Sequence, residues 1–101
     1  MAGKVLKWSP RAKKELNAIL RYFRVRNRSS TYSHKLSKEF RKASERIRQN
    51  EKTGQFVEPN RNIRFVIVAE NYQMFYRLEM RHNTVVTIWD ARRNPDDLKF
   101  D

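Results

Sequence analysis

Cysteine is absent from the sequence, and glycine occurs only at Gly3 and Gly54. Without cysteine the chain has neither a disulfide framework nor a thiolate metal site. Two isolated glycines exclude a glycine-rich phosphate loop, which needs glycines close together. The two histidines, His34 and His82, lie in unrelated segments, where we expect them at the surface. We therefore expect no metal site and no cofactor.

Long hydrophobic runs are also missing. No apolar segment is long enough for a signal peptide or a membrane-spanning helix. We therefore expect a cytoplasmic protein that makes no use of membranes. A chain of 101 residues fits a single domain over residues 1–101, with a modest core.

Acidic residues are scarce in the first half of the chain. Residues 1–50 hold 15 basic and 3 acidic side chains, whereas residues 51–101 hold 8 of each, so the whole net charge of +12 lies in the N-terminal half. Such a field attracts polyanions and speeds their encounter. The expected partner is nucleic acid or an acidic protein, and the alternative is a helix surface selected for solubility.

The chain begins with a strand candidate and the start of a helix. Residues 4–8 are a short strand candidate. Ser9 is placed to cap a helix, and Pro10 suits its first position. Apolar residues then recur at helical spacing, and we expect this helix to end near Asn27.

A second apolar stripe follows at once. Ser29 or Ser30 is the expected cap of a helix that ends before residue 50. Because only a few residues connect the two helices, they must form an antiparallel hairpin. Its outward surface is the expected target-binding face. The basic side chains assigned to it are Arg11, Lys14, Arg21, Arg24, Lys38, Arg41 and Lys42.

The second half has the composition of a sheet. Residues 50–60 are predicted to be a loop, and residues 61–69, 73–80 and 84–90 are predicted strands, rich in β-branched and aromatic side chains. The tail after residue 90 is expected to be irregular. The fold class is therefore α+β, in the order β-α-α-β-β-β, with the helical hairpin packed on one face of a small antiparallel sheet.

Two-residue turns at 71–72 and 82–83 would place Phe65 opposite Leu78 and leave one face almost wholly apolar, against the helices. The other face would mix charge with exposed apolar groups. Its candidate contact residues are Val66, Val68, Phe75, Arg77, Val86 and Ile88. A two-layer domain has no further layer to cover them, so we predict a protein interface, which the tail covers only in part.

Cleavage of RNA without a metal would need cations at the phosphate, a base and an acid. The candidates for the phosphate are Arg64, Arg77, Arg92 and Arg93, and Asp90 or Glu79 is the candidate base. No good acid is evident. For Arg64 and Arg77 we favour the alternative interpretation, which is ion pairing with Glu79.

Three segments together resemble the RelE/ParE toxin superfamily. They are Trp8-Ser9-Pro10 with the helix after it, the pair 62–68 (NIRFVIV) and 71–78 (NYQMFYRL), and 85–95 (VVTIWDARRNP). The resemblance covers essentially the whole chain. It implies a toxin of a type II toxin–antitoxin pair, neutralised by a cognate antitoxin in a hetero-oligomer. The antitoxin would lie across the mixed sheet face described above and around the helical hairpin, with acidic groups that complement the basic helices.

The superfamily divides by target. RelE-like members cut mRNA on the ribosome, and ParE-like members inhibit DNA gyrase. Arg64 matches the family's arginine on the second strand, and Arg92 lies near the matching arginine after the last strand. The tail, residues 97–101, has no Tyr or His that could serve as the C-terminal acid of the nuclease branch. The ending at 91–95 is ParE-like. The resemblance therefore favours a gyrase inhibitor that is not an enzyme. An mRNA endonuclease is the first alternative, and a basic nucleic-acid-binding module is the second.

Overall fold

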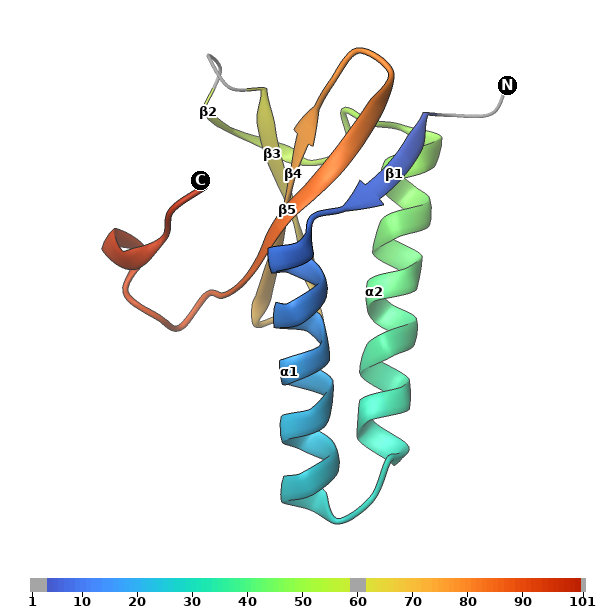
Figure 1. The fold of residues 1–101 in the computed structure, drawn as a ribbon, viewed down its shortest axis with the longest axis vertical. Coiled ribbons are helices and arrows are strands. Elements are labelled where there is room, and N and C mark those ends of the chain that lie inside the picture. Colours follow the sequence, from blue (N-terminus) through green and yellow to red (C-terminus); the bar gives the residue numbers. More distant parts are fainter. Residues whose placement is uncertain (1–3, 59–61, 101) are drawn as a thin grey trace.

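The computed structural model describes residues 4–58 and 62–100. Two helices form a hairpin against one side of a five-stranded sheet, whose strand order is β1-β5-β4-β3-β2 (Figure 1). The elements are β1 (Val5–Trp8), α1 (Pro10–Asn27), α2 (Thr31–Gln49), β2 (Gln55–Glu58), β3 (Ile63–Val68), β4 (Tyr72–Leu78), β5 (His82–Asp90) and the short 3₁₀ helix η2 (Pro95–Asp97). In the described part of the chain, no helix is long and apolar enough to cross a membrane.

The start and end of α1 follow the local signals. The Ser9 hydroxyl accepts a hydrogen bond from the Ala12 amide at 3.0 Å, and Pro10 is the first helical residue. Arg28 closes the helix in the left-handed conformation, with φ at 50°. Ser30 occupies the cap position of α2 without a capping hydrogen bond from its side chain. The predicted helices are therefore confirmed.

The sheet differs from the prediction in two respects. Residues 50–60, expected to be a loop, contain the edge strand β2, which pairs antiparallel with β3. In addition, β1 pairs parallel with β5, so the sheet is mixed rather than antiparallel. Residues 59–61, which include the start of the strand predicted at 61–69, lie outside the described residues.

The turn between β3 and β4 has three residues, 69–71, instead of the predicted two at 71–72. Ala69 and Glu70 adopt positive φ values of 50° and 69°, which residues with a Cβ rarely do. Phe65 therefore pairs with Phe75, three residues from its predicted partner. A shift by an odd number exchanges the two faces of one strand relative to the other.

The connection between β4 and β5 also lies earlier than predicted. Leu78 pairs with Asn83, so residues 82 and 83 belong to β5 rather than to the turn. Further along, Phe75 pairs with Thr87 and Tyr76 pairs with Val85. The pairing shifts there by one residue, so β5 carries a bulge.

Two apolar clusters result, one on each side of the sheet. The inner core packs β3, β4 and β5 against the hairpin, and it includes Val66, Val68 and Ile88. The outer cluster lies on the opposite face and consists of Ile63, Phe75, Val86 and Trp89. The C-terminal tail passes over that side, away from α2 (Figure 1).

Candidate partner-binding site

The predicted interface on the sheet is not exposed. The side chains of Val66, Val68, Phe75 and Ile88 are only 2 to 4 % exposed, and Val86 is also buried. The prediction that these residues form an open protein-binding face is therefore wrong. The register turns Val66, Val68 and Ile88 toward the helices, whereas Phe75 and Val86 stay on the outer face.

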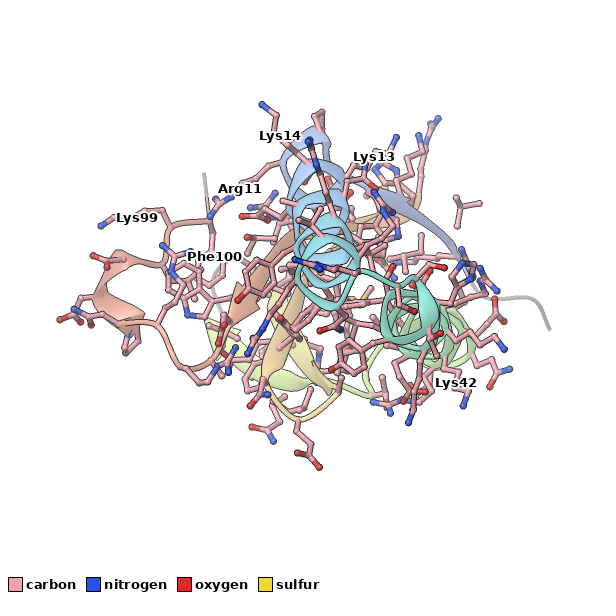
Figure 2. The ribbon with its side chains drawn as sticks, turned by 90° about the horizontal axis from the view of Figure 1, so that it is seen from below. Arg11, Lys13, Lys14, Lys42, Lys99 and Phe100 are labelled. Atoms are coloured by element: carbon pink, nitrogen blue, oxygen red, sulfur yellow. The ribbon has the colours of Figure 1, made fainter. Side chains whose placement is uncertain are left out.

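The outer cluster is covered by the tail, more completely than we expected. Leu98 and Phe100 pack against it, and the rings of Phe75 and Phe100 are 5.1 Å apart. One guanidinium nitrogen of Arg11, Nη1, donates to the Lys99 carbonyl at 2.6 Å, beside Phe100 (Figure 2). Five of the six predicted contact residues are buried, and the sixth, Arg77, is half-buried.

Arg64 has a role in the fold. Its Nη1 donates to the carbonyls of Lys52, at 3.2 Å, and Gly54, at 2.8 Å. Its guanidinium also lies 4.0 Å from the centre of the Phe56 ring. Among the described residues, neither Arg64 nor Arg77 forms the expected ion pair with Glu79. The Glu79 carboxylate accepts from the Thr84 hydroxyl and lies 3.4 Å from Nε2 of His82. Arg64 therefore fixes the segment that leads into β2.

The structure does not bring the candidate arginines together. Arg64 pairs with Tyr76, so Arg77, the next residue along β4, points to the other face of the sheet. Arg92 follows the end of β5, where Asp90 pairs with Tyr72. Tyr72 and Arg77 are five positions apart along one strand, or about 17 Å. No phosphate site can therefore use all three arginines at once.

Asp90 is engaged by its neighbour. Arg92 forms two side-chain hydrogen bonds with its carboxylate, at 3.0 and 2.7 Å. Hydrogen bonding from Arg92 holds the pKa of Asp90 below its ordinary value, despite partial burial. Burial raises the pKa of Tyr72. Neither group is tuned for proton transfer near neutral pH.

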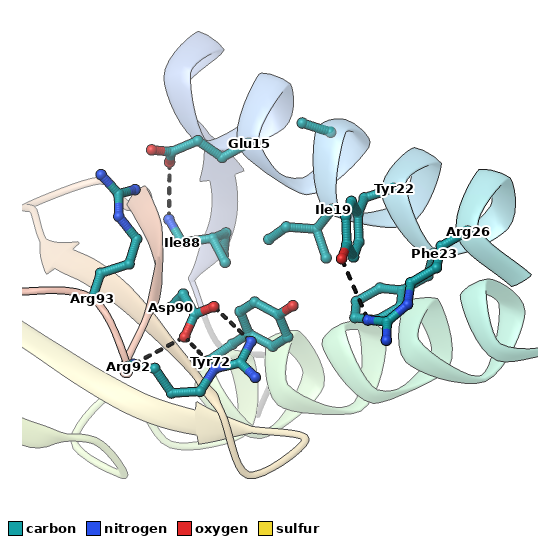
Figure 3. Close-up of a pocket in the computed structure, with 11 residues that line it drawn as sticks. Glu15, Ile19, Tyr22, Phe23, Arg26, Tyr72, Ile88, Asp90, Arg92 and Arg93 are labelled. Carbon is teal, nitrogen blue, oxygen red and sulfur yellow. Dashed lines mark hydrogen bonds and ion pairs between the residues drawn. The ribbon is translucent and has the colours of Figure 1, made fainter.

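A groove of about 520 Å³ lies between α1 and the end of β5 (Figure 3). Apolar side chains and two tyrosines line much of it, and three arginines stand around it. The lining residues are Glu15, Ala18, Ile19, Tyr22, Phe23, Arg26, Tyr72, Ile88, Asp90, Arg92 and Arg93. This concave site was missed from the sequence, because it depends on how α1 crosses β5.

Two of the groove arginines, Arg26 and Arg93, form no direct ion pair within residues 4–58 and 62–100. Arg26 donates to the Tyr22 hydroxyl at 3.3 Å, and Arg93 lies over the Trp89 ring, 4.3 Å from its centre. The carboxylates of the groove are already paired, Asp90 with Arg92 among them. The rim is therefore cationic, and it favours an acidic ligand.

A second hollow, of about 570 Å³, continues from the groove along α1. Tyr22 and Val25 lie in it, with 55 % and 67 % of their surfaces exposed. Arg21 and Arg26 flank them. We call the two hollows together the α1 groove. It combines an apolar floor with a basic rim, which is the pattern of a protein-binding surface.

The predicted basic face surrounds the hairpin rather than forming one patch. Six of its seven side chains are exposed, and Arg11 is half-buried against Glu15 and the tail. Lys14 and Lys42 point to different sides of the hairpin (Figure 2). Lys42 also forms an ion pair of 3.4 Å with Glu39.

The sequence matches the family model described as the ParE toxin of the type II toxin–antitoxin system parDE, over residues 6–95. No curated protein matches the sequence. A solved structure described as the chromosomal ParDE TA system from P. aeruginosa has the same fold, with a TM-score of 0.72 and 16 % identity. That match covers 88 % of this chain and 97 % of the other. The family model spans most of the chain and confirms the ParE-like branch, so this protein belongs to the ParE toxin family of type II toxin–antitoxin systems.

Proposed function

We propose that this protein arrests growth by inhibiting DNA gyrase, and that it does not cut RNA. The observation that carries the proposal is the separation of Arg64, Arg77 and Arg92 in the fold. Arg64 is held by backbone carbonyls and Arg92 by Asp90. We place the whole chain, as one domain, in the cytoplasm with its target.

Cleavage of RNA would require a different arrangement. A metal-independent nuclease needs cations around one phosphate and an acid and a base within reach of it. Here the Tyr76 hydroxyl donates to the Glu51 carbonyl and accepts from the Gly54 amide, and burial raises its pKa. That tyrosine supports the fold of residues 51–54 and is not available as an acid.

We further propose that a cognate antitoxin neutralises the toxin by binding the α1 groove. An amphipathic segment with apolar side chains would fill the floor beside Tyr22 and Val25. Acidic residues of the segment would pair with Arg26 and Arg93. The groove replaces the predicted contact residues as the antitoxin site, because Val66, Val68 and Ile88 face the helices and the tail covers Phe75 and Val86.

The target can be tested in growing bacteria. After induction of the toxin, we expect a reporter plasmid to lose negative supercoils while its mRNA stays intact in primer-extension assays. An Arg77→Ala variant should behave like the wild type, because this side chain joins no phosphate site. New mRNA 5′ ends within minutes of induction, with unchanged plasmid topology, would replace the proposal by the endonuclease alternative.

A further inference from the structure

The outer cluster is covered by a short irregular segment, residues 94–100, which we call the strap. Leu98 and Phe100 are the strap side chains that pack on the cluster, and both stay only half-buried. Residues 94–97 are exposed. Asn94 caps the N-terminus of their short helix, and its side chain accepts a hydrogen bond from the Asp96 amide at 3.0 Å. The described strap residues add no strand to the sheet. The cover is therefore shallow.

The strap has the chemistry of a recognition segment. Asp96 and Asp97 precede Leu98 and Phe100, which are two positions apart. The backbone at Leu98 is extended, with φ at −78° and ψ at 122°. In an extended chain, side chains two positions apart point to the same side. The cluster thus accommodates an extended stretch with two apolar side chains, which directly follows two acidic residues in the short helix η2.

The surroundings of the cluster are cationic. Arg11 donates to the Lys99 carbonyl at 2.6 Å, and Arg93 lies 4.3 Å from the centre of the Trp89 ring. Arg77 pairs with Ile63 and so stands on the same face as the cluster. A partner with carboxylates beside its apolar side chains would complement Arg77 and Arg93.

The apolar face also extends beyond the strap. Phe65 packs against the cluster, and by register Ile67 shares the face of Phe65, with 46 % of its surface exposed. We propose that the outer cluster is a docking surface for an extended acidic segment of a partner protein. The strap occupies this surface in the free toxin. The apolar side chains of the partner replace Leu98 and Phe100, and the strap swings away on residues 91–93.

Replacement of the strap by a separate segment can be measured with a labelled peptide that carries residues 94–100 of this chain. The full-length variant Leu98→Ser/Phe100→Ser should release the strap and bind the peptide. The wild type should bind it at least tenfold more weakly, because a tethered segment competes at an effective concentration of roughly millimolar. Lys99→Ala is the matched control, because the side chain is exposed and only the carbonyl contacts Arg11. This control should behave as the wild type.

Two altered peptides and a single-residue variant test which groups cause the binding. A peptide with both apolar residues changed to Ser should not bind, and one with both Asp changed to Asn should bind more weakly, most clearly at low salt. If the double variant does not fold, Phe100→Ala on its own serves for the same titration. Equal binding to wild type and variant, or no binding to a folded variant, would overturn the proposal. So would dimerisation of the variant, which would assign the surface to a second copy.

Discussion

Glu15 is the only acidic residue in α1, and it carries the contact between that helix and β5. Its Oε1 accepts from the Thr87 hydroxyl at 2.7 Å and from the Ile88 amide at 3.0 Å. Its Oε2 lies 3.3 Å from Nε of Arg11. Glu15 was not singled out from the sequence, and its contacts with β5 give it a structural role beside the groove.

Glu15→Ala should lower the free energy of unfolding by about 1 to 3 kcal/mol, because it leaves the buried Thr87 hydroxyl and the Ile88 amide without an acceptor. Urea unfolding followed by circular dichroism measures this. Glu15→Gln keeps an acceptor and should cost less. The control Glu39→Ala removes only a surface pair with Lys42 and should cost under about 1 kcal/mol. Equal effects at both sites would contradict the role assigned to Glu15.

Gly54 is a second residue with a tight environment. A Cβ added there would lie 2.7 Å from the Phe65 carbonyl oxygen and 2.7 Å from the Tyr76 hydroxyl. Gly54→Ala should therefore displace the segment before β2 and destabilise the protein by roughly 1 to 3 kcal/mol. Faster amide exchange in β2 and β3 would accompany the loss. Unchanged stability would show that this segment adjusts freely.

At the scale of elements, some features could be predicted from sequence and others could not. The helices could, because Ser9, Pro10 and the apolar stripes are local signals. The β3–β4 turn could not, because Ala69 and Glu70 take left-handed conformations without glycine or asparagine. That turn moved Val66 and Val68 of β3 to the inner face, and the shifted pairing of β4 with β5 did the same for Ile88. Phe75 and Val86 lie on the predicted outer face, but the tail packs over them. The strap and the α1 groove depend on contacts between segments that are distant in the sequence. The periodicity of apolar residues does not predict such contacts.

The exposed stripe of α1 gives a test of the antitoxin site. Val25→Ser should weaken antitoxin binding roughly five- to thirtyfold, as expected when 1 to 2 kcal/mol of apolar contact is lost. Val5→Ser is a matched control, because Val5 in β1 has a similar exposure of 62 % against 67 % for Val25. Isothermal titration with the purified antitoxin measures both. If the two variants bind equally well, the antitoxin lies elsewhere.

At the scale of the whole molecule, two carboxyl groups link stability to pH. A hydrogen bond from Asn83 lowers the pKa of Glu51 below its ordinary 4.5, and one from Arg92 lowers that of Asp90 below 3.8. Their contribution is therefore complete above these ordinary values and is lost as the pH falls through the lowered ones. Glu51→Gln should flatten the fall of the melting temperature below about pH 4.5. A slope identical to that of the wild type would contradict the linkage.

The strong positive charge of the molecule is evident from the sequence. The fold decides where that charge lies and which apolar surfaces lie beside it. The net charge of +12 is spread around the hairpin, while the α1 groove and the strap surface offer apolar floors with arginine rims. Long-range attraction brings an anionic partner near, and the apolar floors give specificity.

An assay with purified DNA gyrase is the direct test of the proposed target. Relaxed plasmid, gyrase and ATP are incubated with increasing amounts of the toxin, and the supercoiled fraction is read on a gel. We predict that the supercoiled product disappears at micromolar toxin, with no RNA degraded in the same preparation. Full supercoiling at a large molar excess of folded toxin would contradict the account.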